Sequence, residues 1–162
     1  MLQSLVNFFS DFPPELATFF LAMTPVGELR LALPVGITLY HLPIWEAFIW
    51  AIFGNMIPPI IILLFAGKFH NWVEKKSGYF AKRWIQQLRR AQEAFKKYEK
   101  YGLLGLMLFV GIPLPMTGAF TGALVAFVLG VPLKKSLPYI FGGVFISATI
   151  VLLITIGAIK IF

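Results

Sequence analysis

The chain has no cysteine, two histidines and seven acidic residues among 162. The absence of cysteine excludes disulfide bonds, thiolate metal sites and cysteine nucleophiles. His41 and His70 stand alone at the ends of apolar segments, and the sequence shows no metal-ligand spacing, nucleophile–base pair or phosphate-binding glycine loop. These absences argue against an enzyme, a bound metal and a resident cofactor.

Apolar residues, by contrast, are in excess. They make up 59% of the chain, and the mean hydropathy is +0.82, whereas soluble domains are about half apolar. We therefore predict one integral membrane domain over residues 1–162, all-α in class.

The net charge of +7 is confined to one segment. Residues 68–101 contain ten Lys or Arg and three acids, and the rest of the chain is balanced. A basic excess can indicate nucleic-acid binding, but basic residues gathered in one loop between apolar segments follow the positive-inside rule instead. We expect this loop to be cytoplasmic and no nucleic-acid partner.

Four apolar segments surround the basic loop. Residues 44–67 and 137–159 are each long enough to span a bilayer, which takes about 20 apolar residues. Residues 13–41 and 102–131 are longer, and helix breakers interrupt both near their centres. We predict that each of these two folds as a hairpin of two half-helices.

The interruptions fall at residues 25–34 and 110–118. Irregular backbone at membrane depth survives only where it is buried in protein or lines a cavity, so we predict re-entrant hairpins. A second hairpin that enters from the cytoplasm also returns Lys134 and Lys135 to the cytoplasm, as the positive-inside rule requires.

The predicted order is an inverted repeat. Residues 13–67 form a hairpin plus a spanning helix, residues 68–101 a basic helix, and residues 102–160 a second hairpin plus spanning helix. Many secondary transporters have this arrangement, with the substrate site where the repeats meet. Because two spans enclose little volume, we expect a homo-oligomer, a dimer.

The basic segment has a seven-residue repeat of paired bases and an apolar face opposite them. This pattern predicts an amphipathic helix in the interface plane, with Trp84 and Phe95 toward the acyl chains. Four bases would contact anionic lipid: Lys82, Arg83, Arg89 and Arg90. The alternative is a helix that only anchors and orients the protein.

Glu28 and Arg30 are the ionisable residues of the first interruption. Intramembrane charges are costly and therefore suggest function. Two positions apart on a helix they would point to different sides, which argues against their pairing with each other. We expect Glu28 to bind a proton or cation and Arg30 to bind an anionic substrate group; a structural ion pair is the alternative. Pro34 closes this interruption, and Asn55 on the spanning helix is a candidate hydrogen-bond partner for a hairpin tip.

The second interruption carries no charge. Pro113 and Pro115 remove backbone donors, and Thr117 is expected to cap a half-helix whose N-terminus presents N–H groups to an anion. Gly118 and Gly122 have the spacing of helix-packing residues. A plain structural kink is the alternative for the whole motif.

Glu28-x-Arg30-x-x-x-Pro34 and Pro113-x-Pro115-x-Thr117-Gly118-Ala119 resemble the motifs of the small multidrug export proteins, compact prokaryotic membrane proteins similar to the DedA/VTT superfamily. This resemblance implies two re-entrant hairpins in a prokaryotic inner membrane. The superfamily implies lipid-phosphate transport, and Glu28 is similar to its acidic re-entrant residue.

Three functions follow. The first is a DedA-like transporter of an amphipathic or lipid-phosphate substrate among membrane lipids, coupled to protons through Glu28. The second is an exporter of small hydrophobic drugs. The third is a scaffold that binds anionic lipid or a partner through the basic helix and transports nothing.

Overall fold

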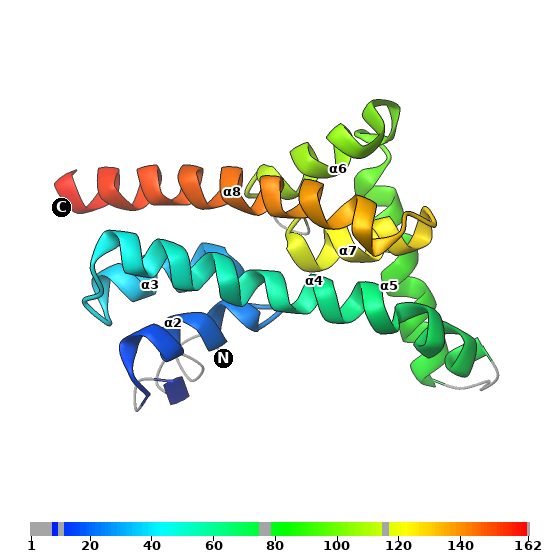
Figure 1. Ribbon diagram of the computed structural model, residues 1–162, viewed down its shortest axis with the longest axis horizontal. Coiled ribbons are helices and arrows are strands. Elements are labelled where there is room, and N and C mark those ends of the chain that lie inside the picture. The colour runs from blue at the N-terminus through cyan, green and yellow to red at the C-terminus, as the bar shows by residue number, and fades with distance from the viewer. Residues whose placement is uncertain (1–7, 10–11, 75–78, 115–116, 162) are drawn as a thin grey trace. The chain divides into compact units, whose positions relative to one another are not determined.

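The computed structural model describes residues 8–9, 12–74, 79–114 and 117–161, and Figure 1 shows its helices. Every element of these described residues is helical, which confirms the predicted all-α class. The chain divides into two compact units, one of residues 1–57 and 144–162 and one of residues 58–143.

Two long helices, α4 (Ile44–Glu74) and α8 (Leu133–Ile161), contain the stretches that can cross a membrane. These stretches are Ile44–Lys68 and Leu133–Ile159, and only 33% and 39% of their most apolar windows are buried inside the protein. Large apolar side chains therefore stay exposed along both helices, as lipid contact requires. They include Phe53, Leu64, Phe65, Leu153 and Ile154.

The first span begins at the predicted residue, but the second begins four residues earlier than predicted. Helix α8 starts directly after Pro132, whose carbonyl accepts bonds from the N–H groups of Lys135 and Ser136. Proline favours a helix start, and lysine is a good helix former, so Lys134 and Lys135 join the first turn.

Helices α2 (Pro14–Met23) and α3 (Glu28–Thr38) pack side by side (Figure 1). The predicted interruption at residues 25–34 was too long, because only residues 24–27 are non-helical and Pro34 lies inside α3. Helical geometry over this stretch buries Leu29 and Leu33 on one side. This burial outweighs the single donor that a proline removes.

The core of this unit forms where α2 meets α3 and the first half of α4. Leu21, Leu29 and Leu33 are fully buried there. Gly54 of α4 lies so close to α2 that a Cβ at this position would collide with the carbonyl oxygen of Phe19. The ring of Phe48 on α4 packs edge-on against Phe145 of α8, with centroids 5.6 Å apart.

The second helical pair, α6 (Gly102–Gly111) and α7 (Ala119–Val128), belongs to the other unit. The described residues between these helices, 112–114 and 117–118, lie within the predicted interruption. Gly122 of α7 packs against Val110 and Leu106 of α6, which confirms its role as a packing residue. Phe109 of α6 is completely buried.

The basic segment is not the single helix predicted over residues 68–101. Helix α4 continues to Glu74, α5 covers Tyr79–Phe95, a short 3-10 turn η1 covers Glu99–Tyr101, and residues 75–78 lie outside the described residues. Residues 69–77 contain no glycine or proline, so no helix breaker stops α4 where the apolar run ends.

The predicted contact of Phe95 with acyl chains was wrong. Phe95 is 2% exposed, and its ring packs edge-on against Phe109 of α6 at 5.6 Å. Trp84 is half-buried, 6.4 Å from the ring of Phe127 on α7. The face that the sequence pattern identified as apolar is real, but it covers the second helical pair of its own chain.

Candidate substrate site

The turn between α2 and α3 is built around Thr24 and Gly27. The Thr24 hydroxyl donates to the Leu21 carbonyl at 2.8 Å and accepts from the Gly27 N–H at 2.9 Å. The Thr24 carbonyl accepts from the N–H of Glu28 at 2.9 Å. A Cβ at Gly27 would lie 2.6 Å from the Thr24 hydroxyl oxygen, so glycine is required for this turn.

Glu28, the first residue of α3, has a left-handed backbone with φ of 44°. A residue with a Cβ adopts this region at a cost of about 1–3 kcal/mol, and such strain clusters at functional sites. This left-handed residue directly follows the turn, whose hydrogen bonds join Thr24 to Gly27 and to Glu28.

Glu28 and Arg30 form an ion pair, contrary to the prediction from their spacing. Nη2 of Arg30 lies 3.9 Å from Oε2 of Glu28. The prediction assumed regular helix at both positions, and the left-handed backbone at Glu28 removes that assumption. The side chains are 16% exposed for Glu28 and 24% for Arg30, so both charges are partly withdrawn from solvent.

The local geometry acts on both charges of this pair. A carboxylate at the first turn of a helix is stabilised by the helix dipole, and the guanidinium of Arg30 presents several donors in a plane. At 3.9 Å the contact is longer than a charge-assisted hydrogen bond. The Glu28–Arg30 contact is therefore an ion pair without a direct hydrogen bond.

The second interruption is held by Thr117. Its Oγ1 lies 2.6 Å from the Ile112 carbonyl oxygen and 2.7 Å from that of Leu114, and it accepts from the Leu114 N–H at 3.2 Å. The hydroxyl donates its one proton to these carbonyls. Both carbonyls also accept backbone bonds, from the N–H of Leu114 at 2.8 Å and from that of Thr117 at 3.2 Å, so the hydroxyl adds a further donor to a turn that backbone bonds already hold.

Thr117 is not the cap of α7, as the sequence predicted. Gly118 occupies the N-cap position, and no side-chain bond caps this helix. The reason is competition, because the Thr117 hydroxyl is already turned back onto the carbonyls of the interruption. Pro113 is half-buried in this segment, and Pro115 lies outside the described residues.

The predicted site residues fall into both units. Glu28, Arg30, Pro34 and Asn55 belong to the unit of residues 1–57 and 144–162, and Asn55 is 6% exposed. Pro113, Thr117 and Gly118 belong to the other unit. Glu28 and Arg30 are in direct contact within the first of these units.

The bases predicted to contact lipid are all exposed on α5. Lys82, Arg83, Arg89 and Arg90 lie away from the buried face that Leu88, Ala91 and Phe95 form. Their exposure agrees with the predicted amphipathic division of this helix.

Two features escaped the sequence analysis. The first is Thr24, whose signal was the pattern Thr-Pro-x-Gly, a combination typical of turns. The second is Glu99, an acid within a run of lysines, which lines an apolar cavity together with Phe95 and Leu106.

A family model described as "Putative small multi-drug export protein" matches residues 28–150. The chain belongs to this family. The match to the small multi-drug export family starts at Glu28, so it includes the Glu28–Arg30 pair and the second interruption, and it leaves out α2. No curated protein and no solved structure matches the chain.

Proposed function

We propose that this chain is a membrane transporter that exports small amphipathic molecules, with Glu28 and Arg30 in the substrate pathway. The observation that carries the proposal is the length of the paired helices. Helices α2, α3, α6 and α7 have 10 or 11 residues each, about 15 Å at 1.5 Å per residue. The hydrocarbon core is about 30 Å thick, so each pair is the right size to enter the membrane and return.

Side-chain hydroxyls bond the irregular backbone of both turns. The Thr24 hydroxyl satisfies groups of the first turn, and the Thr117 hydroxyl satisfies carbonyls of the second. Broken helices of this kind form the substrate sites of many transporters, which supports re-entrant hairpins on both sides of the membrane.

The Glu28–Arg30 pair provides the exchange step of the proposed transport. An organic cation displaces Arg30 from the Glu28 carboxylate, and proton uptake by Glu28 has the same effect on the pair. Restoring the pair then releases the substrate. The partial exposure of both side chains supports access of a solute to them.

Transport of a lipid phosphate, as in the DedA-like superfamily, is the second candidate. The exposed bases of α5 favour it, because each Lys or Arg near an anionic membrane surface contributes about 1 kcal/mol of attraction. In this version the substrate phosphate binds Arg30. If the protein is instead a scaffold that transports nothing, its binding of anionic lipid would depend on these exposed bases of α5 and not on Glu28 or Arg30.

The topology is tested by single-cysteine labelling, for which the chain has no background cysteine. Glu28→Cys, Thr117→Cys, Lys134→Cys and the marker Lys97→Cys are treated with a membrane-impermeant maleimide in right-side-out and inside-out vesicles. We expect label at position 28 from outside and at positions 97, 117 and 134 from inside. Label at 134 from outside alone contradicts the second re-entrant hairpin.

The function is tested by export of radiolabelled benzyltrimethylammonium from proteoliposomes. We expect Glu28→Gln to lower the rate at least tenfold, and the matched control Glu93→Gln, an exposed acid on α5, to leave it unchanged. A separate assay follows a fluorescent polyprenyl phosphate, whose movement should depend on Arg30 if lipid phosphate is the substrate.

Three results distinguish the candidates. Loss of cation export in Glu28→Gln supports the exporter. Loss of lipid-phosphate movement in Arg30→Gln, without cation export in the native protein, assigns the second candidate. Normal transport in the folded double variant Glu28→Gln/Arg30→Gln removes the pair from the mechanism. If the native protein transports neither probe, and its binding of anionic lipid depends on Lys82, Arg83, Arg89 and Arg90, the scaffold is assigned.

A further inference from the structure

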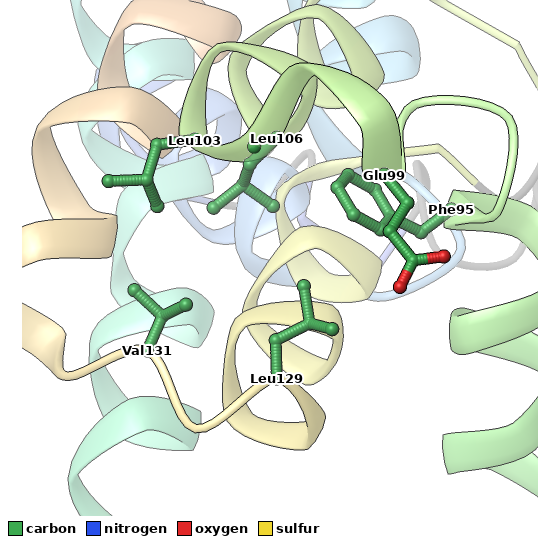
Figure 2. Close-up of a pocket in the computed structure, with 7 residues that line it drawn as sticks. Phe95, Glu99, Leu103, Leu106, Leu129 and Val131 are labelled. Atoms are coloured by element: carbon green, nitrogen blue, oxygen red, sulfur yellow. The ribbon is translucent and has the colours of Figure 1, made fainter.

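An apolar cavity of about 270 Å³ lies within the unit of residues 58–143. The end of α5, the η1 turn, the start of α6 and the segment between α7 and α8 form its walls (Figure 2). Seven residues line it: Phe95, Glu99, Gly102, Leu103, Leu106, Leu129 and Val131.

Glu99 is the charged residue of this lining. In Figure 2, Leu103 and Leu106 of α6 face Leu129 and Val131 across the cavity, and the Glu99 carboxylate lies at one side. Ligand sites commonly combine apolar walls with a few polar groups that fix orientation. One carboxylate beside four aliphatic side chains therefore selects an apolar molecule that carries a positive charge.

The nearby lysines are not among the residues that line the cavity. Lys96, Lys97 and Lys100 are close in sequence, but none of them belongs to the lining. Nζ of Lys100 lies 4.9 Å from the ring centroid of Tyr101, where it makes a cation–π contact. An anionic amphiphile in the cavity would bring its own charge toward the Glu99 carboxylate.

We propose that this cavity binds small apolar organic cations, with the apolar part between α6 and Leu129 and the cationic centre beside Glu99. Its part in export rests on the proposed function, because the cavity then selects the substrate class. Its volume, near the lower end for ligand pockets, suits a solute with one aromatic ring.

The test is equilibrium binding of radiolabelled benzyltrimethylammonium to the purified full chain in detergent micelles, with empty micelles to correct for partition. Two unlabelled competitors separate charge from shape. Neopentylbenzene is the neutral molecule of the same shape, and phenylacetate is an anion of similar size.

Two variants probe the cavity, and each has a matched control outside it. Glu99→Gln removes the charge, with Glu93→Gln as its control. Leu129→Trp fills the cavity from an exposed position, with Leu108→Trp as its control, since Leu129 and Leu108 are each 41% exposed and Leu108 is not in the lining.

We expect Glu99→Gln to weaken binding of the cation by about threefold to fivefold, the effect of an exposed ion pair, and to leave competition by neopentylbenzene unchanged. Leu129→Trp should weaken binding of the cation and of neopentylbenzene by about tenfold, equivalent to the loss of two buried methylene groups. Neither control variant should change binding.

Unchanged binding in Leu129→Trp overturns the proposal. Stronger competition by phenylacetate than by the unlabelled cation also overturns it and would assign the cavity to anionic amphiphiles. Binding is measured without transport, so the two proposals can fail separately. Cavity-dependent binding without export leaves the cavity assignment standing and overturns the proposed function. Export of the cation with binding that neither cavity variant changes overturns the cavity assignment and leaves the proposed function standing.

Discussion

The guanidinium of Arg30 lies 3.9 Å from the carboxylate of Glu28, two residues earlier in the chain. On a regular helix, side chains at this spacing do not face each other. They meet here because the backbone of Glu28 is left-handed, with φ of 44°. The first turn of α3 thus balances its own charges at the cost of local backbone strain.

A double-mutant cycle should detect this pair. We expect the double variant to lose less stability than the sum of the losses in Glu28→Gln and Arg30→Gln, because the first substitution already breaks the pair. The coupling should be about 0.2–1 kcal/mol, because both side chains retain partial exposure. Thermal unfolding in detergent measures it, and a coupling of zero would mean that the contact contributes nothing to stability.

The left-handed backbone at residue 28 predicts an order of stability among uncharged variants. Glu28→Gly and Glu28→Gln both remove the carboxylate, but glycine adopts positive φ without the Cβ penalty of about 1–2 kcal/mol. We expect Glu28→Gly to unfold at a higher temperature than Glu28→Gln. The opposite order would show that residue 28 is not left-handed in the folded protein.

Thr117 should stabilise the second interruption through its hydroxyl. Thr117→Val keeps the shape and removes the bonds of the hydroxyl to two part-buried carbonyls, which keep their backbone donors, so the cost should be about 0.5–1.5 kcal/mol, that of one hydrogen bond. Thr117→Ser, which retains the hydroxyl, should cost less. The control is Thr149→Val, because the Thr149 hydroxyl donates to the Phe145 carbonyl in an exposed position. Thermal unfolding measures the loss of stability in all three variants. Equal losses at residues 117 and 149 would contradict the role of Thr117.

Two glycines of α4 should respond oppositely to alanine. A Cβ at Gly54 meets the backbone of Phe19, which cannot move aside cheaply, whereas a Cβ at Gly67 meets nothing within 4 Å. Gly54→Ala should therefore destabilise by about 1–3 kcal/mol. Gly67→Ala should be neutral or stabilising by up to about 1 kcal/mol through helix propensity. The denaturation midpoints of both variants measure these changes. A Gly54→Ala variant as stable as the native protein would refute the close approach of α2 and α4.

Local chemistry predicted the second interruption better than the first. At residues 110–118, prolines, a threonine and glycines concentrate the breakers, and the helix does end there. At residues 25–34, Pro34 looked like part of a break, but burial of Leu29 and Leu33 on α2 keeps the chain helical through it. Propensity is a weak guide where apolar packing competes with it.

In the candidate site, too, local sequence predicted the residues and tertiary packing decided their contacts. The composition of residues 28–30 identified Glu28 and Arg30, but their pairing depends on the left-handed backbone of Glu28, which the residue types do not predict. The cavity at Glu99 joins residues from 95 to 131, and such contacts leave no periodic trace in the sequence.

The sequence by itself determined the helical class, the first span, the two interrupted segments and the amphipathic division of the basic helix. Each of these follows from periodicity or composition over neighbouring residues. The tertiary structure decided which surface covers that amphipathic face: Phe95 packs on Phe109 and not on lipid. A hydrophobic stripe has the same pattern whatever apolar surface covers it, so the partner becomes known only when distant segments pack together.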